Sequence, residues 1–128
     1  MEAGIELRHI TKRYGSDASA PLVVKGLDLA VPRGTLTTLL GPSGCGKTTV
    51  LRMIAGLESP TSGQVLIGGN DVTALSPAER NVSMVFQSYA LFPHMNVIAN
   101  VAYGLTVSGV ARDSAQQRAR AALEGVGL

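Results

Sequence analysis

The sequence contains little cysteine, no long apolar run and only a small excess of positive charge. Its single cysteine, Cys45, excludes an internal disulfide and a metal site built from cysteines. No apolar stretch reaches the ~18 residues of a membrane-spanning helix, and residues 1–4 have neither the basic nor the apolar region of a signal peptide. These absences predict a cytosolic chain.

The formal net charge of +2 is too small to indicate nucleic-acid binding, because the basic residues form no run and are not interleaved with aromatic residues. We therefore expect no nucleic-acid partner. Hydrophobic residues make up 45% of the 128 positions, which is enough for the core of one domain or of part of one. A folded chain is expected rather than a disordered one.

Residues 41–48 (GPSGCGKT) have the spacing G-x-x-x-x-G-K-[ST] of the phosphate-binding P-loop. Glycines keep side chains away, so that backbone N–H groups can point at an anion, and a helix that begins at the lysine directs its positive dipole end to the same place. In such a loop Lys47 reaches the terminal phosphates and the Thr48 hydroxyl binds Mg²⁺. The pattern requires a strand immediately before the loop and a helix immediately after it.

The segments on both sides of the loop meet this requirement. Residues 35–40 (TLTTLL) form an apolar run of strand-favouring residues. After the loop, apolar residues recur with helical spacing until a glycine at position 56 and a proline at position 60 end the pattern; they are Val50, Met53, Ile54 and Leu57. A strand, a loop and a helix are therefore predicted in this order.

Further strands are predicted on both sides of this unit. Residues 5–10 alternate between apolar and polar, residues 23–31 contain one or two strands, and residues 64–67 and 82–86 are short apolar runs. The small polar residues 15–21 predict a loop. Ser76, followed by Pro77 and by Glu79 three residues after the serine, predicts a capping box on a short helical turn.

The pattern changes from strands to helices near Ser88. Asn96 is predicted to cap a helix with one apolar face, and Ser108 and Gly109 to end it. A second capping box at Ser114 predicts another helix. The residues expected on one face of the first helix are Val97, Ile98, Val101, Ala102 and Leu105, and the inward positions expected on the second are Ala115, Ala119, Ala122 and Leu123.

Three separated motifs occur along the chain: K-R-Y-G at residues 12–15, G-P-S-G-C-G-K-T-T at residues 41–49 with its continuation L-R-M-I-A-G-L, and V-F-Q-S-Y-A-L-F-P-H at residues 85–94. Together they resemble the nucleotide-binding subunit of ATP-binding-cassette (ABC) transporters. The resemblance implies an α/β fold with a P-loop NTPase core of the ABC ATPase type. Residues 1–87 would form this core and an antiparallel β subdomain, with an incomplete sheet, and residues 88–128 the start of an α-helical subdomain.

The resemblance also implies individual roles at a site for ATP and Mg²⁺. Lys47 corresponds to the catalytic lysine on the β- and γ-phosphates, and Thr48 to the residue that binds Mg²⁺. Gln87 corresponds to the glutamine that contacts the Mg²⁺ and the attacking water, and Tyr14 to the aromatic residue that lies against adenine. The phosphate cradle would consist of Gly41, Ser43, Gly44, Cys45, Gly46, Lys47, Thr48 and Thr49.

Several of these residues also have a purely structural interpretation. Cys45 can simply fill a variable position of the loop, Gln87 can close a strand, and Tyr14 can cover the core. Residues 89–95, from Tyr89 to Met95, lie where the family's helical subdomain meets its transmembrane partner, but they could also form a core cluster.

The resemblance is strongest to bacterial importers of the maltose, polyamine, ferric-iron and phosphonate group, on the P-loop variant, P-A-E-R at residues 77–80 and N-V-A-Y-G-L at residues 100–105. It implies an ATP-binding subunit that couples ATP binding and hydrolysis to solute uptake. The expected partners are transmembrane permease subunits near residues 89–95, a second copy of the subunit and, indirectly, a periplasmic solute-binding protein. The expected location is the cytoplasmic face of the inner membrane.

Two alternatives stay open: an ABC ATPase that does not transport, and a fragment that binds nucleotide without turnover. The family's L-S-G-G-Q signature, its acidic strand and its switch histidine do not occur in these 128 residues. We therefore expect the amino-terminal part of an ATPase, truncated within its helical subdomain. The full-length subunit should hydrolyse ATP, and the 128-residue chain alone should be inactive and aggregation-prone, because its P-loop strand would expose an apolar edge.

Overall fold

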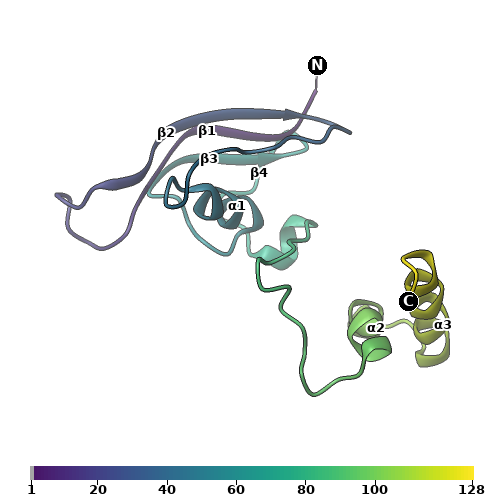
Figure 1. Ribbon diagram of the computed structural model, residues 1–128. Helices are drawn as coiled ribbons and strands as arrows, with labels where there is room; N and C mark the ends of the chain where they lie inside the picture. The colour runs from purple at the N-terminus through teal and green to yellow at the C-terminus, as the bar shows by residue number, and fades with distance from the viewer. Residues whose placement is uncertain (1) are drawn as a thin grey trace. The chain divides into compact units, whose positions relative to one another are not determined.

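The computed structural model describes residues 2–128, and the chain divides into two compact units, Met1–Met84 and Val85–Leu128. We call them the first unit and the second unit. The first contains the labelled strands and helix α1, and the second contains helices α2 and α3 (Figure 1). The functional division after residue 87, into a P-loop core and a helical subdomain, stays a prediction.

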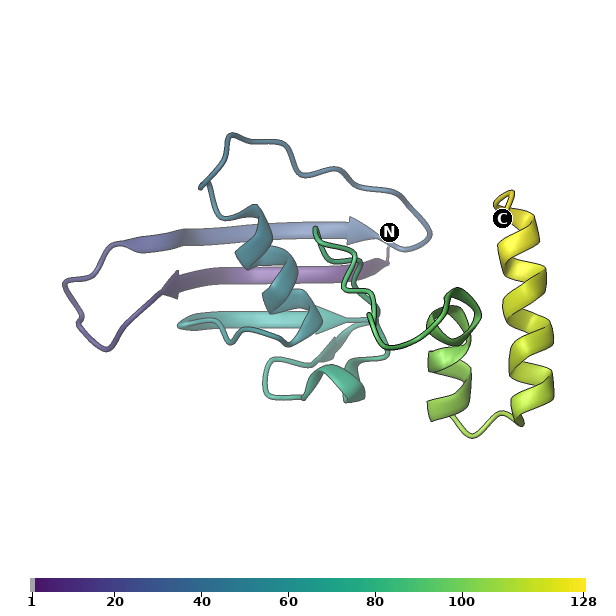
Figure 2. The same ribbon diagram turned by 60° about the horizontal axis from the view of Figure 1, so that its bottom comes forward.

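A four-stranded antiparallel sheet with the order β2-β1-β3-β4 is the largest feature of the first unit (Figure 2). In β1, Leu7 pairs with Leu29 on one side and with Val65 on the other. The strands predicted at residues 5–10, 23–31 and 64–67 are confirmed, and all three are longer than expected. The bounds are β1 Ala3–Arg13, β2 Leu22–Pro32, β3 Ser62–Ile67 and β4 Asn70–Asp71.

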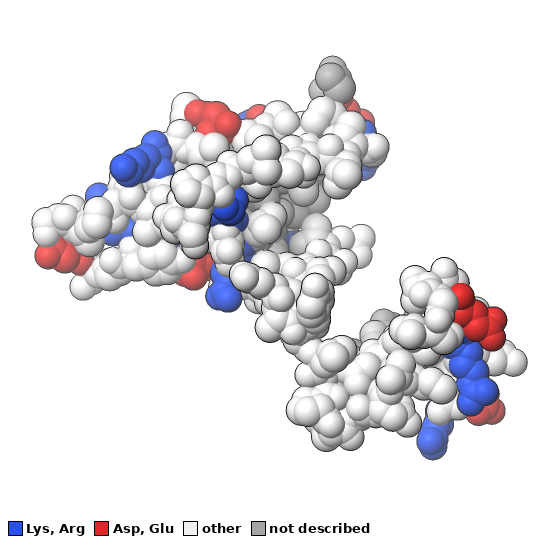
Figure 3. All heavy atoms as spheres, in the orientation of Figure 1, with Lys and Arg blue, Asp and Glu red and all other residues white. Residues whose placement is uncertain are grey.

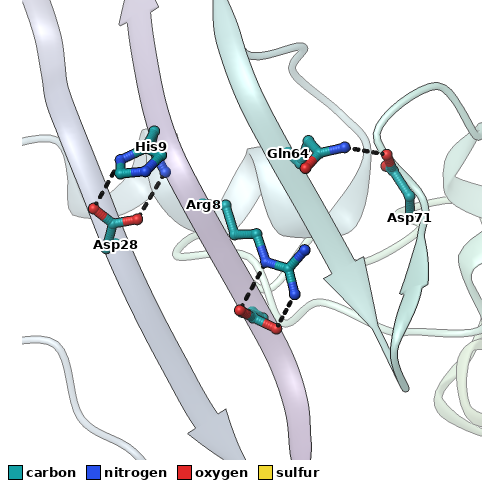
Figure 4. Close-up of polar contacts among 6 residues, drawn as sticks. Arg8, His9, Asp28, Gln64 and Asp71 are labelled. Carbon is teal, nitrogen blue, oxygen red and sulfur yellow. Dashed lines mark hydrogen bonds and ion pairs between the residues drawn. The ribbon is translucent and has the colours of Figure 1, made fainter.

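A bulge in β1 at His9 changes which side chains reach the core. The φ angle of His9 is +49°, and the pairing of β1 with β2 shifts register between Leu7 and Ile10. The His9 backbone N–H donates to Asp28 Oδ1 at 2.9 Å, and its ring Nδ1 lies 3.1 Å from Asp28 Oδ2 (Figure 4). Residues three apart point to opposite faces of a regular strand, but an inserted residue lets both face inward. Leu7 and Ile10 are accordingly 1% and 0% exposed.

Helix α1 (Lys47–Ala55) packs against one face of this sheet, and the core lies between them. The predicted inward residues Val50 and Met53 are buried, whereas Leu57 is 45% exposed beyond the end of the helix. Gly56 ends the helix, as predicted, with a φ of +85° that suits a glycine. The buried core consists of Leu7, Ile10, Val24, Val50, Met53, Val65 and Val72.

The strands predicted at residues 35–40 and 82–86 are wrong, because neither segment has regular secondary structure. Leu36 is 96% exposed, Leu40 is 90% exposed and Val85 is 83% exposed. A strand needs a hydrogen-bonded neighbour, and no strand of the part that the structure describes pairs with either segment. Apolar, β-favouring composition alone therefore did not produce a strand.

The second unit consists of helices α2 (Val97–Val107) and α3 (Arg112–Gly125). The predicted cap is confirmed, because Asn96 Oδ1 accepts the Ala99 N–H at 2.8 Å. The buried core is small and consists of Ala102, Ala115 and Ala119. None of the helices among residues 2–128 combines the length and the apolar character that crossing a bilayer requires.

Two expectations for α3 are wrong. The helix begins at Arg112 rather than after Ser114, with Ala111 in the capping position and no side-chain cap. Because the helix begins two residues before Ser114, Ser114 lies inside its first turn. It does not occupy the capping position, so its capping box does not form. Ala122, expected to face inward, is exposed, because the contact with α2 is made one and two turns earlier at Ala115 and Ala119.

Candidate nucleotide-binding site

The loop at residues 41–48 leaves little room for side chains. Gly44 and Gly46 have φ angles of +82° and +95°, in the left-handed region that favours glycine. A Cβ at Gly46 would also lie 3.2 Å from the Val23 carbonyl oxygen, and a Cβ at Gly41 would lie 2.6 Å from Cys45 Sγ. The backbone of this loop is thus accessible because its glycines carry no side chain.

Helix α1 begins at Lys47, directly after the left-handed Gly46. The first intrahelical bond runs from the Val50 N–H to the Gly46 carbonyl at 2.9 Å. No side chain caps this end, and its first turn contains no acidic residue. The N–H groups and the positive end of the helix dipole are therefore available to an anion, as in phosphate-binding loops.

Lys47 folds back over the loop from which it starts. Its Nζ donates to the carbonyl of Gly41, and to the carbonyl of Pro42 at 3.2 Å. The ammonium group thus lies beside the beginning of the loop. Thr48, on the first turn of α1, is exposed.

A cavity of about 680 Å³ lies between the loop and strand β2. It is lined by Gly44 and Cys45 of the loop, by Val50 of α1 and by residues 22–27. Ligand pockets commonly measure roughly 300–1,000 Å³, so a nucleotide is of suitable size. The sequence identified residues 22–27 only as a strand, and no local pattern marked them as a cavity wall.

Tyr14 lies beside α1. Its hydroxyl is 3.3 Å from Thr49 Oγ1 and donates to Glu58 Oε2 at 3.4 Å. The residue remains 48% exposed, and Lys12 Nζ lies over its ring, 5.0 Å from the centroid. The structure therefore brings Tyr14 close to the P-loop helix, next to Lys12 of the K-R-Y-G motif and to Glu58, which the sequence did not single out.

Arg80 is a further residue that sequence reasoning missed. It is 4% exposed, and its guanidinium donates to the carbonyls of Met53 at 2.8 Å and Ile54 at 3.2 Å, in the last turn of α1. It also donates to the Thr73 carbonyl at 3.1 Å and the Leu75 carbonyl at 2.9 Å. Burial lowers the pKa of Arg80 below its ordinary value. Arg80 thus holds the carboxyl end of the helix whose amino end forms the loop.

The short helix η1 (Pro77–Arg80) presents this arginine. Its capping box is confirmed, because the Ser76 N–H donates to Glu79 Oε2 at 2.9 Å and the Ser76 hydroxyl donates to the same oxygen at 2.8 Å. The capping motif was visible in the sequence. The contact of Arg80 with α1 was not, because it joins residues 27 positions apart.

Gln87 belongs to the second unit, where it is exposed in a turn closed by the Tyr89 N–H and the Phe86 carbonyl at 2.9 Å. Its role at the Mg²⁺ site stays a prediction. Tyr89 and Ala90, which follow it, have φ angles of +64° and +53°. These left-handed residues turn the chain sharply where the predicted partner-binding segment begins.

Asn100 fixes the shape of that segment. Its Oδ1 accepts the Phe92 N–H at 2.8 Å, and its Nδ2 donates to the carbonyls of Phe92, Met95 and Asn96 at 3.0–3.2 Å. The Phe92 ring packs on Tyr103 of α2, with centroids 4.6 Å apart. Residues 92–96 are therefore held by a single amide side chain of α2.

The left-handed glycines, the uncapped helix at Lys47 and the adjoining cavity define a P-loop nucleotide-binding protein. The model of the family described as ABC transporter matches residues 24–128, and the chain belongs to this family. The predicted resemblance is thereby confirmed.

Curated relatives include the Fe(3+) ions import ATP-binding proteins FbpC 1 of Rhizobium meliloti (strain 1021), 60% identical, and FbpC of Brucella abortus (strain 2308), 57% identical. Each match covers 97% of this chain, which spans 34% of the relatives' length. Among solved structures, a dimeric ATP-binding cassette in a post-hydrolysis state, bound to ADP and phosphate, matches with a TM-score of 0.82 and 28% identity. That match covers 94% of this chain and 56% of the other. The fold is that of an ABC ATPase cassette, of which the chain contains a part.

Proposed function

We propose that this chain is the nucleotide-binding part of an ABC-type ATPase subunit that drives solute import. The observation that carries the proposal is the loop itself, in which side-chain-free backbone, an uncapped helix and Lys47 meet beside a cavity of about 680 Å³. Membership of the ABC transporter family supports ATP as the nucleotide.

The residues present fit Mg-ATP. The backbone N–H groups of the loop and of the first turn of α1 would hold the phosphates, and Lys47 would exchange its carbonyl partners for phosphate oxygens. The exposed hydroxyl of Thr48 is the hard oxygen ligand that Mg²⁺ prefers. Mg²⁺ neutralises phosphate charge when bound, and Gln87 would orient the attacking water.

Equilibrium binding of Mg-ATP tests this assignment. Lys47→Ala should weaken binding about 10- to 100-fold, since a hydrogen bond to a charged group contributes ~1.5–3 kcal/mol. Arg8→Ala is the matched control, because Arg8 (Figure 4) has a half-exposed side chain on the sheet and forms an ion pair with Glu6. Equal affinities of wild type and Lys47→Ala would contradict the assignment.

We further propose Fe³⁺ as the solute of the import system, bound by other chains. Relatives that carry the name Fe(3+) ions import ATP-binding protein, at 53–60% identity, support this choice. The full-length subunit, reconstituted in vesicles with the permease subunits of a ferric-iron importer, should support ATP-dependent iron uptake. Hydrolysis of ATP without association with a permease would favour an ABC ATPase that does not transport.

The permease would contact residues 89–95. A second copy of the subunit would complete a dimer. A periplasmic solute-binding protein would act from the other side of the inner membrane. Two observations support this surface. Tyr89 is 76% exposed and Leu91 is 74% exposed. No Lys, Arg, Asp or Glu occurs from residue 85 to residue 111, and on the face shown in Figure 3 the charged side chains of the second unit gather along one side. Apolar, uncharged surface is typical of the centre of a protein interface.

Co-purification with the permease tests the contact. Leu91→Asp should abolish it, because an unpaired carboxylate would be buried in the interface. Val107→Asp places the same charge on a side chain that is 69% exposed near the end of α2 and serves as the control. Loss of co-purification in both variants, or in neither, would argue against residues 89–95 as the contact.

A further inference from the structure

Three side chains surround Tyr14 and hold it in place. Glu58 Oε2 accepts a hydrogen bond from the Tyr14 hydroxyl at 3.4 Å, and Glu58 Oε1 lies 3.0 Å from Lys12 Nζ. Thr49 Oγ1 lies 3.3 Å from the same hydroxyl. We call Lys12, Tyr14, Thr49 and Glu58 the ring cluster.

Glu58 is the centre of the ring cluster, because its two oxygens bind two different partners. The side chains of Lys12 and Glu58 are only 12% and 26% exposed, so water screens their attraction less than on the open surface. The Ser59 carbonyl also accepts from Lys12 Nζ at 2.6 Å. One carboxylate therefore contacts both the ammonium group, which the Ser59 carbonyl also holds, and the Tyr14 hydroxyl, which Thr49 also contacts.

Lys12 covers one face of the Tyr14 ring. Its Nζ lies over the ring, 5.0 Å from the centroid, in the arrangement that a cation adopts on an aromatic face. Tyr14 is still 48% exposed, so part of the residue remains accessible to a planar ligand.

Thr49 connects the ring cluster to the loop. It follows Thr48 directly in α1, so the hydroxyl contact fixes the ring relative to the helix that would hold the phosphates. A ligand that contacts both places meets groups already in position, and preorganisation of this kind increases affinity.

We propose that Glu58 is a positioning residue for the nucleotide base: by fixing Lys12 beneath one face of Tyr14 and by fixing the hydroxyl, it presents the other face to a purine. The proposal rests on the proposed function, since it presumes that a nucleotide binds at the loop. It adds Lys12 and Glu58, which contact Tyr14 rather than the ligand, to the residues that determine base affinity.

The test compares Mg-ATP with inorganic tripolyphosphate, which contains the phosphates and no base, in equilibrium binding to the full chain. Glu58→Ala should weaken Mg-ATP binding about fivefold and leave tripolyphosphate binding unchanged, because the variant keeps the ring on which a base can stack and loses only a group that positions it. Tyr14→Phe, which keeps the ring and removes the hydroxyl, should have a similar but smaller effect. Glu58→Gln retains an acceptor for the hydroxyl and should fall between wild type and Glu58→Ala.

Glu6→Ala is the control, since Glu6 forms an ion pair with Arg8 on the exposed face of the sheet. Unchanged Mg-ATP binding in Glu58→Ala, or an equal loss for Mg-ATP and tripolyphosphate, would overturn the proposal and leave the proposed function intact. If Glu58→Ala does not fold, the same comparison with Glu58→Gln and Tyr14→Phe decides. Failure of wild type to bind either ligand would overturn the proposed function, and this proposal with it.

Discussion

The first unit buries large apolar side chains from three strands and a helix, whereas the second unit buries three alanines from two helices. Met53, Leu7, Ile10 and Val65 are almost fully enclosed in the first unit. In the second, large apolar residues such as Val97, Val101 and Tyr103 are between 41% and 61% exposed. Burial of apolar area is the main stabilising contribution, so the first unit should be the more stable one. The second unit keeps its apolar side chains on the surface, where a partner protein could bury them.

Truncation in the core of the first unit should have the largest effect. Met53→Ala removes a side chain that is 0% exposed and should lower the free energy of unfolding by ~2–5 kcal/mol, through lost burial and the cavity left behind. Hydrogen exchange of the β1 amides measures the loss of stability in the first unit, and hydrogen exchange of the α3 amides measures it in the second unit. Leu57→Ala, at a half-exposed position, is the control. Equal loss of protection in β1 and α3 would break the comparison, because the units would then unfold together.

Arg80→Met should cost about 2–3 kcal/mol, because the carbonyls of Met53, Ile54 and Thr73 lose a buried donor. The loss of stability should appear as faster hydrogen exchange of the α1 amides and as a lower affinity for Mg-ATP. Arg33→Met removes a second arginine, whose side chain is 67% exposed, and should change stability by less than ~0.5 kcal/mol. Similar urea midpoints for the two variants would show that Arg80 does not hold α1.

Enlarging the alanine core should affect the second unit alone. Ala119→Leu places three more carbon atoms between α2 and α3, and overpacking of this kind costs ~1–3 kcal/mol. Ala122→Leu, at the exposed position on the same helix, should be nearly neutral. Helix content followed by circular dichroism during urea unfolding would detect the difference. A larger effect of Ala122→Leu than of Ala119→Leu would mean that the face of α3 that packs against α2 is assigned wrongly.

The smallest effect should be a pH dependence of the first unit. The Ser76 backbone N–H, and then its hydroxyl, lower the pKa of Glu79 below its ordinary value of 4.5. Hydrogen bonds from Thr73, first from its hydroxyl, lower the pKa of Asp71 in the same way. A carboxyl group whose pKa is lowered by folding stabilises the protein above its ordinary pKa, and this contribution is lost as the pH falls through the folded pKa.

Acidification below about pH 4.5 should therefore lower the urea midpoint of the first unit. Glu79→Gln should make this decline shallower, because the glutamine does not titrate. Glu124→Gln, in α3 of the second unit, serves as the control. An unchanged slope in Glu79→Gln would show that the capping box contributes nothing to the acid sensitivity.

Local features were predicted well, because their bonds join residues close in sequence. The end of α1 at Gly56, the Asn96 cap and the Ser76 capping box each depend on contacts within four residues. The predictions that failed depended on neighbours. Residues 35–40 and 82–86 have the composition of strands but no pairing strand, and Ala122 has the character of a core residue but no helix against it.

The candidate site divides in the same way. Gly41, Lys47 and Thr48 could be identified from their spacing, since a phosphate-binding loop is a continuous piece of backbone. The cavity wall on β2, the arginine under α1 and the partners of Tyr14 could not. Each depends on antiparallel pairing and helix packing that bring distant residues together, and no sequence pattern encodes those distances.

By itself, the sequence determined a P-loop, the helix that follows it and membership of the ABC transporter family, because these depend on short-range geometry and residue spacing. Only the tertiary structure decided which residues surround Tyr14, what holds the carboxyl end of α1 and which apolar side chains remain on the surface. The physical reason is that burial, ion pairing and hydrogen bonding act between groups that meet only when the sheet and the helices pack.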